Sequence, residues 1–243
     1  MYNGRKISIV IPCYNEEEGI AKVINRIPEF VDEIIVVDNH STDNTKYVAE
    51  SLGAKVVFEE IRGYGRAYKT GFKNVSGDII VTLDGDGSYP VEELPKLLDF
   101  MAERNLDFVS GKRFPLMDKS SMEVGNIVGN KVVTLIANLL FVTNFKDVLS
   151  GMWAFKRSVL PKMQLISDNW DFSEEIKIEA ILNENIKFGE FHISYYKRTG
   201  KSKLSLWKVG IGNILFLFKK RFLRRWRKDS GSLTILGKED LTR

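Results

Sequence analysis

The sequence predicts an α/β fold with a mostly parallel central sheet flanked by helices. Apolar, β-branched segments alternate with helix-like segments through the first half of the chain, which is the order of βαβ units. These apolar segments are continuous rather than alternating with polar residues, so we expect helices to cover both faces of the sheet. A chain of 243 residues can bury a substantial core in one domain of this class.

Each element can be placed on the chain. We expect strands at residues 7–12, 33–38, 54–59, 78–84, 107–113, 151–156 and 187–196. We expect helices at residues 16–27, 43–52, 64–75, 91–104, 122–142 and 172–184. No linker rich in Pro, Gly or Ser separates the two halves, so the second half should fold onto the first. Residues 1–203 then form the main domain, and residues 204–243 form a basic amphipathic helix and tail.

Charge and composition favour a cytoplasmic protein that contacts an anionic surface. The formal net charge is +4, but residues 219–228 hold seven basic residues and no acidic one, which leaves the remainder at about −3. The amino terminus lacks the apolar core of a signal peptide, and the single cysteine, Cys13, excludes an intrachain disulfide. The longest apolar runs, 132–143 and 209–218, are shorter than the roughly 20 residues of a spanning helix, so we expect none.

Polar segments follow three of the predicted strands at the point where each strand ends. "CYNEEE" begins at residue 13, "DNHSTDNT" at residue 38 and "DGDGSYP" at residue 84. In open α/β sheets, ligands bind beyond the carboxyl ends of the strands. We therefore expect these three segments to converge on one crevice.

Asp84 and Asp86 are the candidate metal ligands. If the strand continues through them, both side chains point to one face, where two carboxylates raise each other's pKa unless a cation lies between them. Mg²⁺ or Mn²⁺, ligated by carboxylate and phosphate oxygens, would remove that conflict. A solvated Asp-Gly turn is the alternative. A calcium loop of the EF-hand type would need glycine at Tyr89 and glutamate at Pro95, so it is excluded.

Five motifs carry a resemblance to a known family. "IVIPCYNEEEGI", "VVDNHSTDNT", "LDGDGSYP", "DVLSGMWAF" and "YKRTGKSKL", in this order, resemble the inverting family-two glycosyltransferases with a GT-A fold. More narrowly, the chain is similar to the polyprenyl-phosphate (dolichyl-phosphate) glycosyltransferases, which include mannose and glucose synthases. The similarity covers roughly residues 6–205. It implies a nucleotide-sugar donor, a polyprenyl-phosphate acceptor and a divalent metal.

The resemblance also implies roles for donor-binding residues. Residues that match the loop lining the nucleoside pocket are Pro12, Tyr14, Asn15 and Glu16. Asp38 matches a carboxylate that contacts the base or ribose, and the Asp84–Asp86 pair matches the motif that holds the metal and the diphosphate. Many mannose-transferring members have glutamine where Ser88 stands, so a third protein ligand is in doubt here and water is the alternative.

Further residues match the acceptor side and a closing loop. Asp147 matches an acidic residue beside the sugar and the acceptor phosphate, and Arg113 matches an arginine that helps bind that phosphate. Arg198 and Lys203 match basic residues of a flexible loop that closes over the diphosphate. An anionic lipid phosphate needs no strong general base. If the acceptor were a sugar hydroxyl instead, Asp147 would be the best candidate for the base.

The carboxyl-terminal segment predicts contact with a membrane. Residues 204–228 can form one helix with an apolar stripe and basic residues mostly off it, as in a helix that lies in a membrane interface. The stripe comprises Trp207, Ile211, Ile214, Leu215, Phe218, Phe222 and Trp226. A lid on the core and a dimer contact are the alternatives. For the segment 122–142, the sequence leaves two alternatives, a core helix and a lipid-facing surface.

We therefore expect a metal-dependent enzyme, peripheral on the cytosolic face of a membrane. The motifs favour UDP-glucose or UDP-N-acetylglucosamine over GDP-mannose as donor. A saccharide acceptor and, in another class, a nucleotide or nucleic-acid binding module are the competing hypotheses. We expect no nucleic acid partner, and a homo-oligomer is left open. "RGYGRAY" (62–68) lacks the last glycine of the dinucleotide fingerprint, so we interpret it as a turn near the nucleotide.

Overall fold

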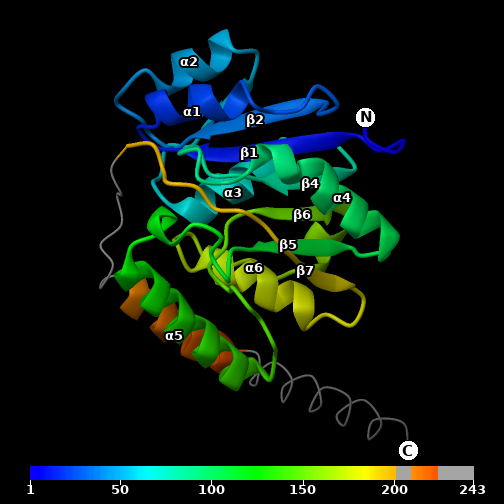
Figure 1. Ribbon diagram of the computed structural model, residues 1–243, viewed down its shortest axis with the longest axis vertical. Coiled ribbons are helices and arrows are strands. Elements are labelled where there is room, and N and C mark those ends of the chain that lie inside the picture. Colours follow the sequence, from blue (N-terminus) through cyan, green and yellow to red (C-terminus); the bar gives the residue numbers. More distant parts are fainter. Residues whose placement is uncertain (201–208, 224–243) are drawn as a thin grey trace, which may run out of the picture.

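The computed structural model describes residues 1–200 and 209–223 and contains a single seven-stranded sheet of order β3-β2-β1-β4-β6-β5-β7 (Figure 1). The strands are β1 (Ile7–Cys13), β2 (Glu33–Asp38), β3 (Lys55–Phe58), β4 (Ile79–Thr82), β5 (Phe108–Lys112), β6 (Trp153–Lys156) and β7 (Phe188–His192). β1 pairs in parallel with β2 and β4, and β2 pairs in parallel with β3. β6 runs antiparallel to both β4 and β5, and β7 is parallel to β5. The predicted mostly parallel sheet is confirmed.

Helices follow the strands as the sequence predicts. They are α1 (Glu17–Ile24), α2 (Thr45–Ser51), α3 (Tyr64–Lys73), α4 (Leu94–Glu103), α5 (Val124–Phe141) and α6 (Phe172–Ile181). Short 3₁₀ turns lie at Val91–Glu93, Lys119–Ser121 and Arg157–Lys162. A further helix spans 209–223, and we call it the C-terminal helix.

Alternate residues of the strands pack on opposite faces of the sheet, and both faces are covered. In β1, Ile9 and Ile11 join a core formed with α1, α2 and α4. Val10, between them, joins a second core formed with α3 and α6. Successive strand side chains point to opposite faces, so a strand buried on both sides must be apolar throughout. This explains the continuous apolar runs.

A third apolar cluster joins the second half of the chain. Val133 and Phe141 of α5 pack with Ile178 of α6 and with Leu217 of the C-terminal helix, and that helix lies beside α5 in Figure 1. Within the described residues, α5 is the one helix that could cross a membrane by its length and composition, with 28% of it buried. Our expectation that no segment spans a membrane stays a prediction.

The C-terminal helix corrects one interpretation of the basic segment. We assigned Lys220 to a terminal patch for anionic partners, but its side chain is buried, with 3% of the residue exposed. The Lys220 ammonium lies 2.7 Å from Glu175 and 2.9 Å from Glu179 of α6, and it donates to the carbonyl of Gln164 at 2.8 Å. This lysine therefore fastens the C-terminal helix to the domain and is not free to meet a ligand. Residues 204–208 and 224–228 of the predicted helix lie outside the described residues.

Candidate active site

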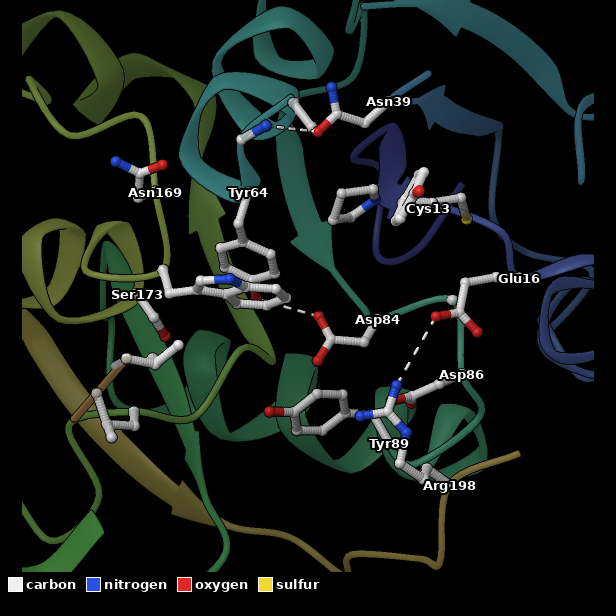
Figure 2. Close-up of a pocket in the computed structure, with 18 of the residues that line it drawn as sticks. Cys13, Glu16, Asn39, Tyr64, Asp84, Asp86, Tyr89, Asn169, Ser173 and Arg198 are labelled. Carbon is white, nitrogen blue, oxygen red and sulfur yellow. Dashed lines mark hydrogen bonds and ion pairs between the residues drawn. The ribbon is translucent and has the colours of Figure 1, made fainter. Parts of the chain in front are cut away.

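A cavity of about 440 Å³ opens at the carboxyl ends of β1, β2 and β4, where the three polar segments were expected to converge (Figure 2). The segments contribute Tyr14 and Glu16 after β1, Asn39 after β2, and Asp84, Gly85 and Asp86 after β4, and Pro12 lines the cavity from the last residues of β1. The convergence is thus confirmed. Parallel strands end at one edge of the sheet, so loops far apart in the sequence meet there.

The loop after β1 faces the cavity at Tyr14 and Glu16, but not at Asn15. Asn15 has a φ of 53°, which an asparagine tolerates in a turn. Its carboxamide oxygen accepts from the Thr42 amide at 2.7 Å, and its own amide donates to the Ser41 hydroxyl at 3.0 Å. Asn15 therefore joins the loops that follow β1 and β2 and does not line the cavity.

Asp38 also lies behind the cavity wall. It is 4% exposed, and its carboxylate accepts from the Ser41 amide at 3.0 Å. The next residue, Asn39, lines the cavity instead. Asn39 accepts from the Gly63 amide at 2.8 Å and donates to the carbonyl of Ile61 at 2.9 Å, so it connects the end of β2 to the start of α3. Sequence reasoning missed Asn39.

The acidic pair lies on a loop rather than on the strand. β4 ends at Thr82, so the condition under which both carboxylates would share a strand face is not met. Both still line the cavity. Burial, and next the negative charge of Asp86, raise the pKa of Asp84 to about 7. Asp86 accepts from the amide of Ser88 at 2.9 Å, while the Ser88 hydroxyl is buried outside the cavity lining.

A cationic side chain already lies beside this pair. The Arg198 guanidinium is 3.2 Å from Asp86 and 3.7 Å from Glu16, and its buried Nε has no hydrogen-bond partner among the described residues (Figure 2). Two backbone bonds hold its segment against the acidic loop. The Thr199 amide donates to the Asp86 carbonyl at 2.8 Å, and the Tyr196 amide donates to the Ser88 carbonyl at 2.9 Å. Lys203 lies outside the described residues.

Arg113 and Asp147 form a buried, two-pronged ion pair. The Asp147 carboxylate accepts from Arg113 Nε at 2.7 Å, Nη2 at 2.9 Å and the backbone amide at 2.9 Å. A fourth bond comes from the Asn130 side chain at 2.9 Å. Although burial opposes it, the nearby Arg113 charge and these bonds lower the pKa of Asp147 to about 2. Arg113 lines the cavity and Asp147, fully buried, does not.

An aromatic wall completes the cavity; sequence reasoning identified Tyr14 in it, but not Tyr64, Trp170 or Tyr195. Tyr64 stacks on Trp170 with ring centroids 4.6 Å apart, and its hydroxyl donates to Asp84 Oδ1 at 3.1 Å. Tyr195 lies 5.1 Å from the Arg113 guanidinium carbon, and Arg62 covers the Tyr14 ring at 4.1 Å. The segment 62–68, interpreted as a turn near the nucleotide, lines the cavity in part, but from Tyr64 on it is the start of α3 and not a turn. Its closeness to a nucleotide stays a prediction. Trp170, the aromatic partner of Tyr64, comes from a distant loop that no local sequence motif indicates.

The acidic pair fits a divalent cation that takes further ligands from a substrate. Within the described residues, no group of three His, Cys, Asp or Glu side chains is arranged to hold a metal alone. Two carboxylates close enough to perturb one another, with an arginine already paired to one of them, nevertheless form a site that favours positive charge. Mg²⁺ and Mn²⁺ accept such mixed oxygen ligands.

Known proteins are similar to this chain in fold and in sequence. Glucosyl-3-phosphoglycerate synthase from Mycobacterium tuberculosis, crystallised with Mn²⁺, uridine diphosphate and glucosyl-3-phosphoglycerate, has a TM-score of 0.70 over 90% of this chain and 80% of that chain, at 23% identity. Glycosyltransferase AglJ of Haloferax volcanii is 34% identical over 87% of this chain and 70% of its own length. The dolichyl-phosphate hexose transferase of the same organism is 32% identical over 84% of this chain and 88% of its own length.

The fold is therefore that of the GT-A glycosyltransferases, an α/β fold with a mixed, mostly parallel sheet between helices. Residues 8–163 match the model of glycosyl transferase family 2. The chain belongs to this family and is a glycosyltransferase, as the motifs predicted.

Proposed function

We propose that this glycosyltransferase moves a sugar from a nucleotide sugar to a polyprenyl phosphate, with inversion at the anomeric carbon and with Mg²⁺ or Mn²⁺ bound. UDP-glucose and UDP-N-acetylglucosamine are the favoured donors, and GDP-mannose is the alternative. The reaction takes place on the cytosolic face of a membrane, to which the protein binds peripherally. The relative named dolichyl-phosphate hexose transferase supports the choice of acceptor.

The observation that carries this proposal is the acidic pair with its neighbouring arginine. Asp84 and Asp86 line a cavity at the ends of parallel strands, and the Arg198 guanidinium lies 3.2 Å from Asp86. These two carboxylates would hold the metal, which would supply positive charge to the leaving diphosphate. The Asp86 and Glu16 carboxylates both lie at Nη2 of Arg198, and among the described residues its Nε has no hydrogen-bond partner, so Nε is a donor that can bind a phosphate oxygen.

Arg113 is proposed to bind the acceptor phosphate. Its Nε and Nη2 are fixed by Asp147, so the guanidinium has one orientation at the cavity wall. The bound phosphate oxygen forms a bond to the anomeric carbon while the bond from that carbon to the diphosphate breaks. Because a phosphate is already anionic, no side chain needs to remove a proton.

The side of the cavity next to the C-terminal helix supports a lipid acceptor. Leu149, Val209 and Asn213 line the cavity, and the last two belong to the C-terminal helix. That helix and α5 carry exposed apolar side chains, among them Leu139 at 71% and Leu215 at 65% exposure. Such exposure on two neighbouring helices is typical of a surface that contacts lipid or another protein. A prenyl chain in the bilayer could then reach the cavity beside the C-terminal helix.

A saccharide acceptor with Asp147 as base is less well supported. All four hydrogen bonds to the Asp147 carboxylate come from protein groups, and the residue is fully buried outside the cavity lining. A base must reach the hydroxyl proton that it removes. We therefore propose Asp147 as the positioning residue for Arg113 and not as the base.

A donor and acceptor panel tests the proposal. Purified protein with Mn²⁺ is incubated with each of the three nucleotide sugars and with a short polyprenyl phosphate, its polyprenol or a soluble saccharide. Glycolipid product is expected only with the phosphate and is measured by mass spectrometry. Asp86→Asn should lower turnover by at least about a hundredfold, whereas Asp99→Asn, on α4, should not. Product formation that survives a chelator, or that needs no lipid phosphate, would overturn the proposal.

A further inference from the structure

Tyr64 occupies the first position of α3, and the start of that helix is closed by protein groups. The amide of Gly65 donates to the Asn169 carbonyl at 3.2 Å, and the amide of Arg66 donates to the Asp168 carbonyl at 3.1 Å. A helix start with free amides can hold a phosphate, but these amides are already used. The role of this turn must therefore lie in its side chains.

The Tyr64 ring is fixed on two sides. Trp170 stacks on it with a centroid distance of 4.6 Å and an interplanar angle of 23°, and Tyr68 meets it edge-on at 4.9 Å. Figure 2 shows the ring between the α3 start and Asp84, with its hydroxyl directed at that carboxylate. A ring clamped in this way cannot turn its hydroxyl to another partner without breaking both contacts.

A glycine leaves the room that the Tyr64 hydroxyl needs. A Cβ at Gly151 would lie 2.6 Å from that hydroxyl oxygen and 3.3 Å from Asp84 Oδ1. Gly151 is itself held in place, because its amide donates to the Tyr89 hydroxyl at 2.6 Å. The Gly151 backbone leaves space for the Tyr64 hydroxyl, and the Trp170 and Tyr68 rings hold the Tyr64 ring in place. The hydroxyl is thus fixed in one position beside the Asp84 carboxylate.

We infer that Tyr64 is a positioning residue that holds the Asp84 carboxylate in the orientation needed to bind the cation. The inference rests on the proposed function, in which Asp84 is a metal ligand. Without the hydroxyl, the carboxylate could turn about its own side-chain bonds, and metal binding would have to stop that motion at a cost in affinity. Trp170, 40% exposed at the cavity, supports Asp84 indirectly through its stacking on Tyr64.

Metal binding without turnover tests the inference. The affinity for Mn²⁺ is measured by electron paramagnetic resonance of free Mn²⁺, in the presence of UDP and, in parallel, of GDP. Tyr64→Phe keeps the ring and its stacking and removes only the hydroxyl. We expect the variant to bind Mn²⁺ about tenfold more weakly, as for the loss of one hydrogen bond to a charged group. Binding of either nucleotide in the presence of EDTA should not change.

Tyr2→Phe is the matched control, because it removes a hydroxyl that donates to Asp99 at 2.7 Å, outside the residues that line the cavity. This variant should bind Mn²⁺ like the wild type. Both variants should remain folded and melt cooperatively, and Tyr64→Phe should keep the tryptophan fluorescence. If Tyr64→Phe binds Mn²⁺ as tightly as the wild type, the inference is wrong and the proposed function stands. If the wild-type protein binds no Mn²⁺ with either nucleotide, both are wrong.

Discussion

The guanidinium of Arg198 lies 3.2 Å from the carboxylate of Asp86 and 3.7 Å from the carboxylate of Glu16. Arg198 is therefore the counterion of the acidic loop when no ligand is bound. A divalent cation that binds Asp86 meets repulsion from this arginine, whereas a nucleoside diphosphate attracts both positive charges. The geometry thus favours joint binding of metal and nucleotide over binding of metal alone.

Replacing Arg198 should have opposite effects on the binding of metal alone and on the joint binding of metal and nucleotide. In Arg198→Gln, we expect Mn²⁺ alone to bind about threefold to tenfold more tightly, because a like charge has been removed. Mn²⁺ and UDP together should bind more weakly by at least a similar factor, because the diphosphate has lost a donor. Titration calorimetry with and without UDP measures both values. Arg104→Gln, an exposed residue at the end of α4, is the control. If the affinity for Mn²⁺ alone also falls in Arg198→Gln, then Arg198 does not compete with the cation for Asp86.

Asp147→Asn distinguishes a positioning residue from a general base. Asp147 and Arg113 form a buried pair, and breaking such a pair by removing one charge costs about 3–5 kcal/mol. We expect a loss of stability of this size in urea unfolding. Misplaced Arg113 should raise the KM for the polyprenyl phosphate more than it lowers kcat. Asp107→Asn, whose partner Lys156 is partly exposed, should cost about 1 kcal/mol or less. A large fall in kcat alone, with unchanged stability, would instead favour the base.

The order of elements along the chain was predictable, whereas the order of strands in the sheet was not. Local patterns of apolar residues determine strands and helices, and all seven predicted strands are present. The insertion of β6 between β4 and β5, antiparallel to both, depends on pairing between distant segments. The side chains of residues 153–156 can be buried whether the strand runs parallel or antiparallel to its neighbours, so the sequence of β6 does not reveal its direction or its position in the sheet.

The candidate site was predictable to a similar extent. The aspartates after β4 and the polar residues after β1 follow from the position of strand ends. Tyr64 with Trp170 could not be found in this way, because stacking between the start of a helix and a distant loop leaves no regular spacing in the sequence. Lys220 was misinterpreted for a related reason. It stands among other basic residues, and only the packing of the C-terminal helix on α6 gives it acidic partners.

The titration of the Glu174 carboxyl should make the free energy of unfolding depend on pH. Glu174 is fully buried, and in the part of the chain that the structure describes neither of its carboxylate oxygens has a hydrogen-bond partner. Burial and the nearby Asp171 charge raise its pKa well above the ordinary value. The folded state then holds a proton that the unfolded state releases above pH 4.5, so stability falls as the pH rises from there toward the folded-state pKa. Lys177 and Glu175 also face this group.

Glu174→Gln removes this titration and should stabilise the protein more at pH 8 than at pH 5. At pH 8 we expect the melting temperature of Glu174→Gln to be several degrees above that of the wild type, since about 1 kcal/mol corresponds to roughly 2–4 °C in a chain of this size. Differential scanning fluorimetry across this range measures the effect. Glu103→Gln, exposed at the end of α4, should show no such difference. A gain that is equal at both pH values would mean that the charge of Glu174 is not the cause.

The exposed face of the C-terminal helix predicts membrane binding that charge can abolish. Leu215 and Phe218 are 65% and 53% exposed, so Leu215→Asp with Phe218→Asp should leave the fold and its melting temperature intact. Each buried apolar side chain contributes about 1.5–3 kcal/mol, and a charge at the interface opposes insertion, so binding to vesicles should fall at least about tenfold. Flotation with phosphatidylglycerol-containing liposomes measures this. Phe58→Asp, on edge strand β3 and 57% exposed, is the matched control and should float like the wild type. If the double variant floats equally well, this helix does not contact the membrane.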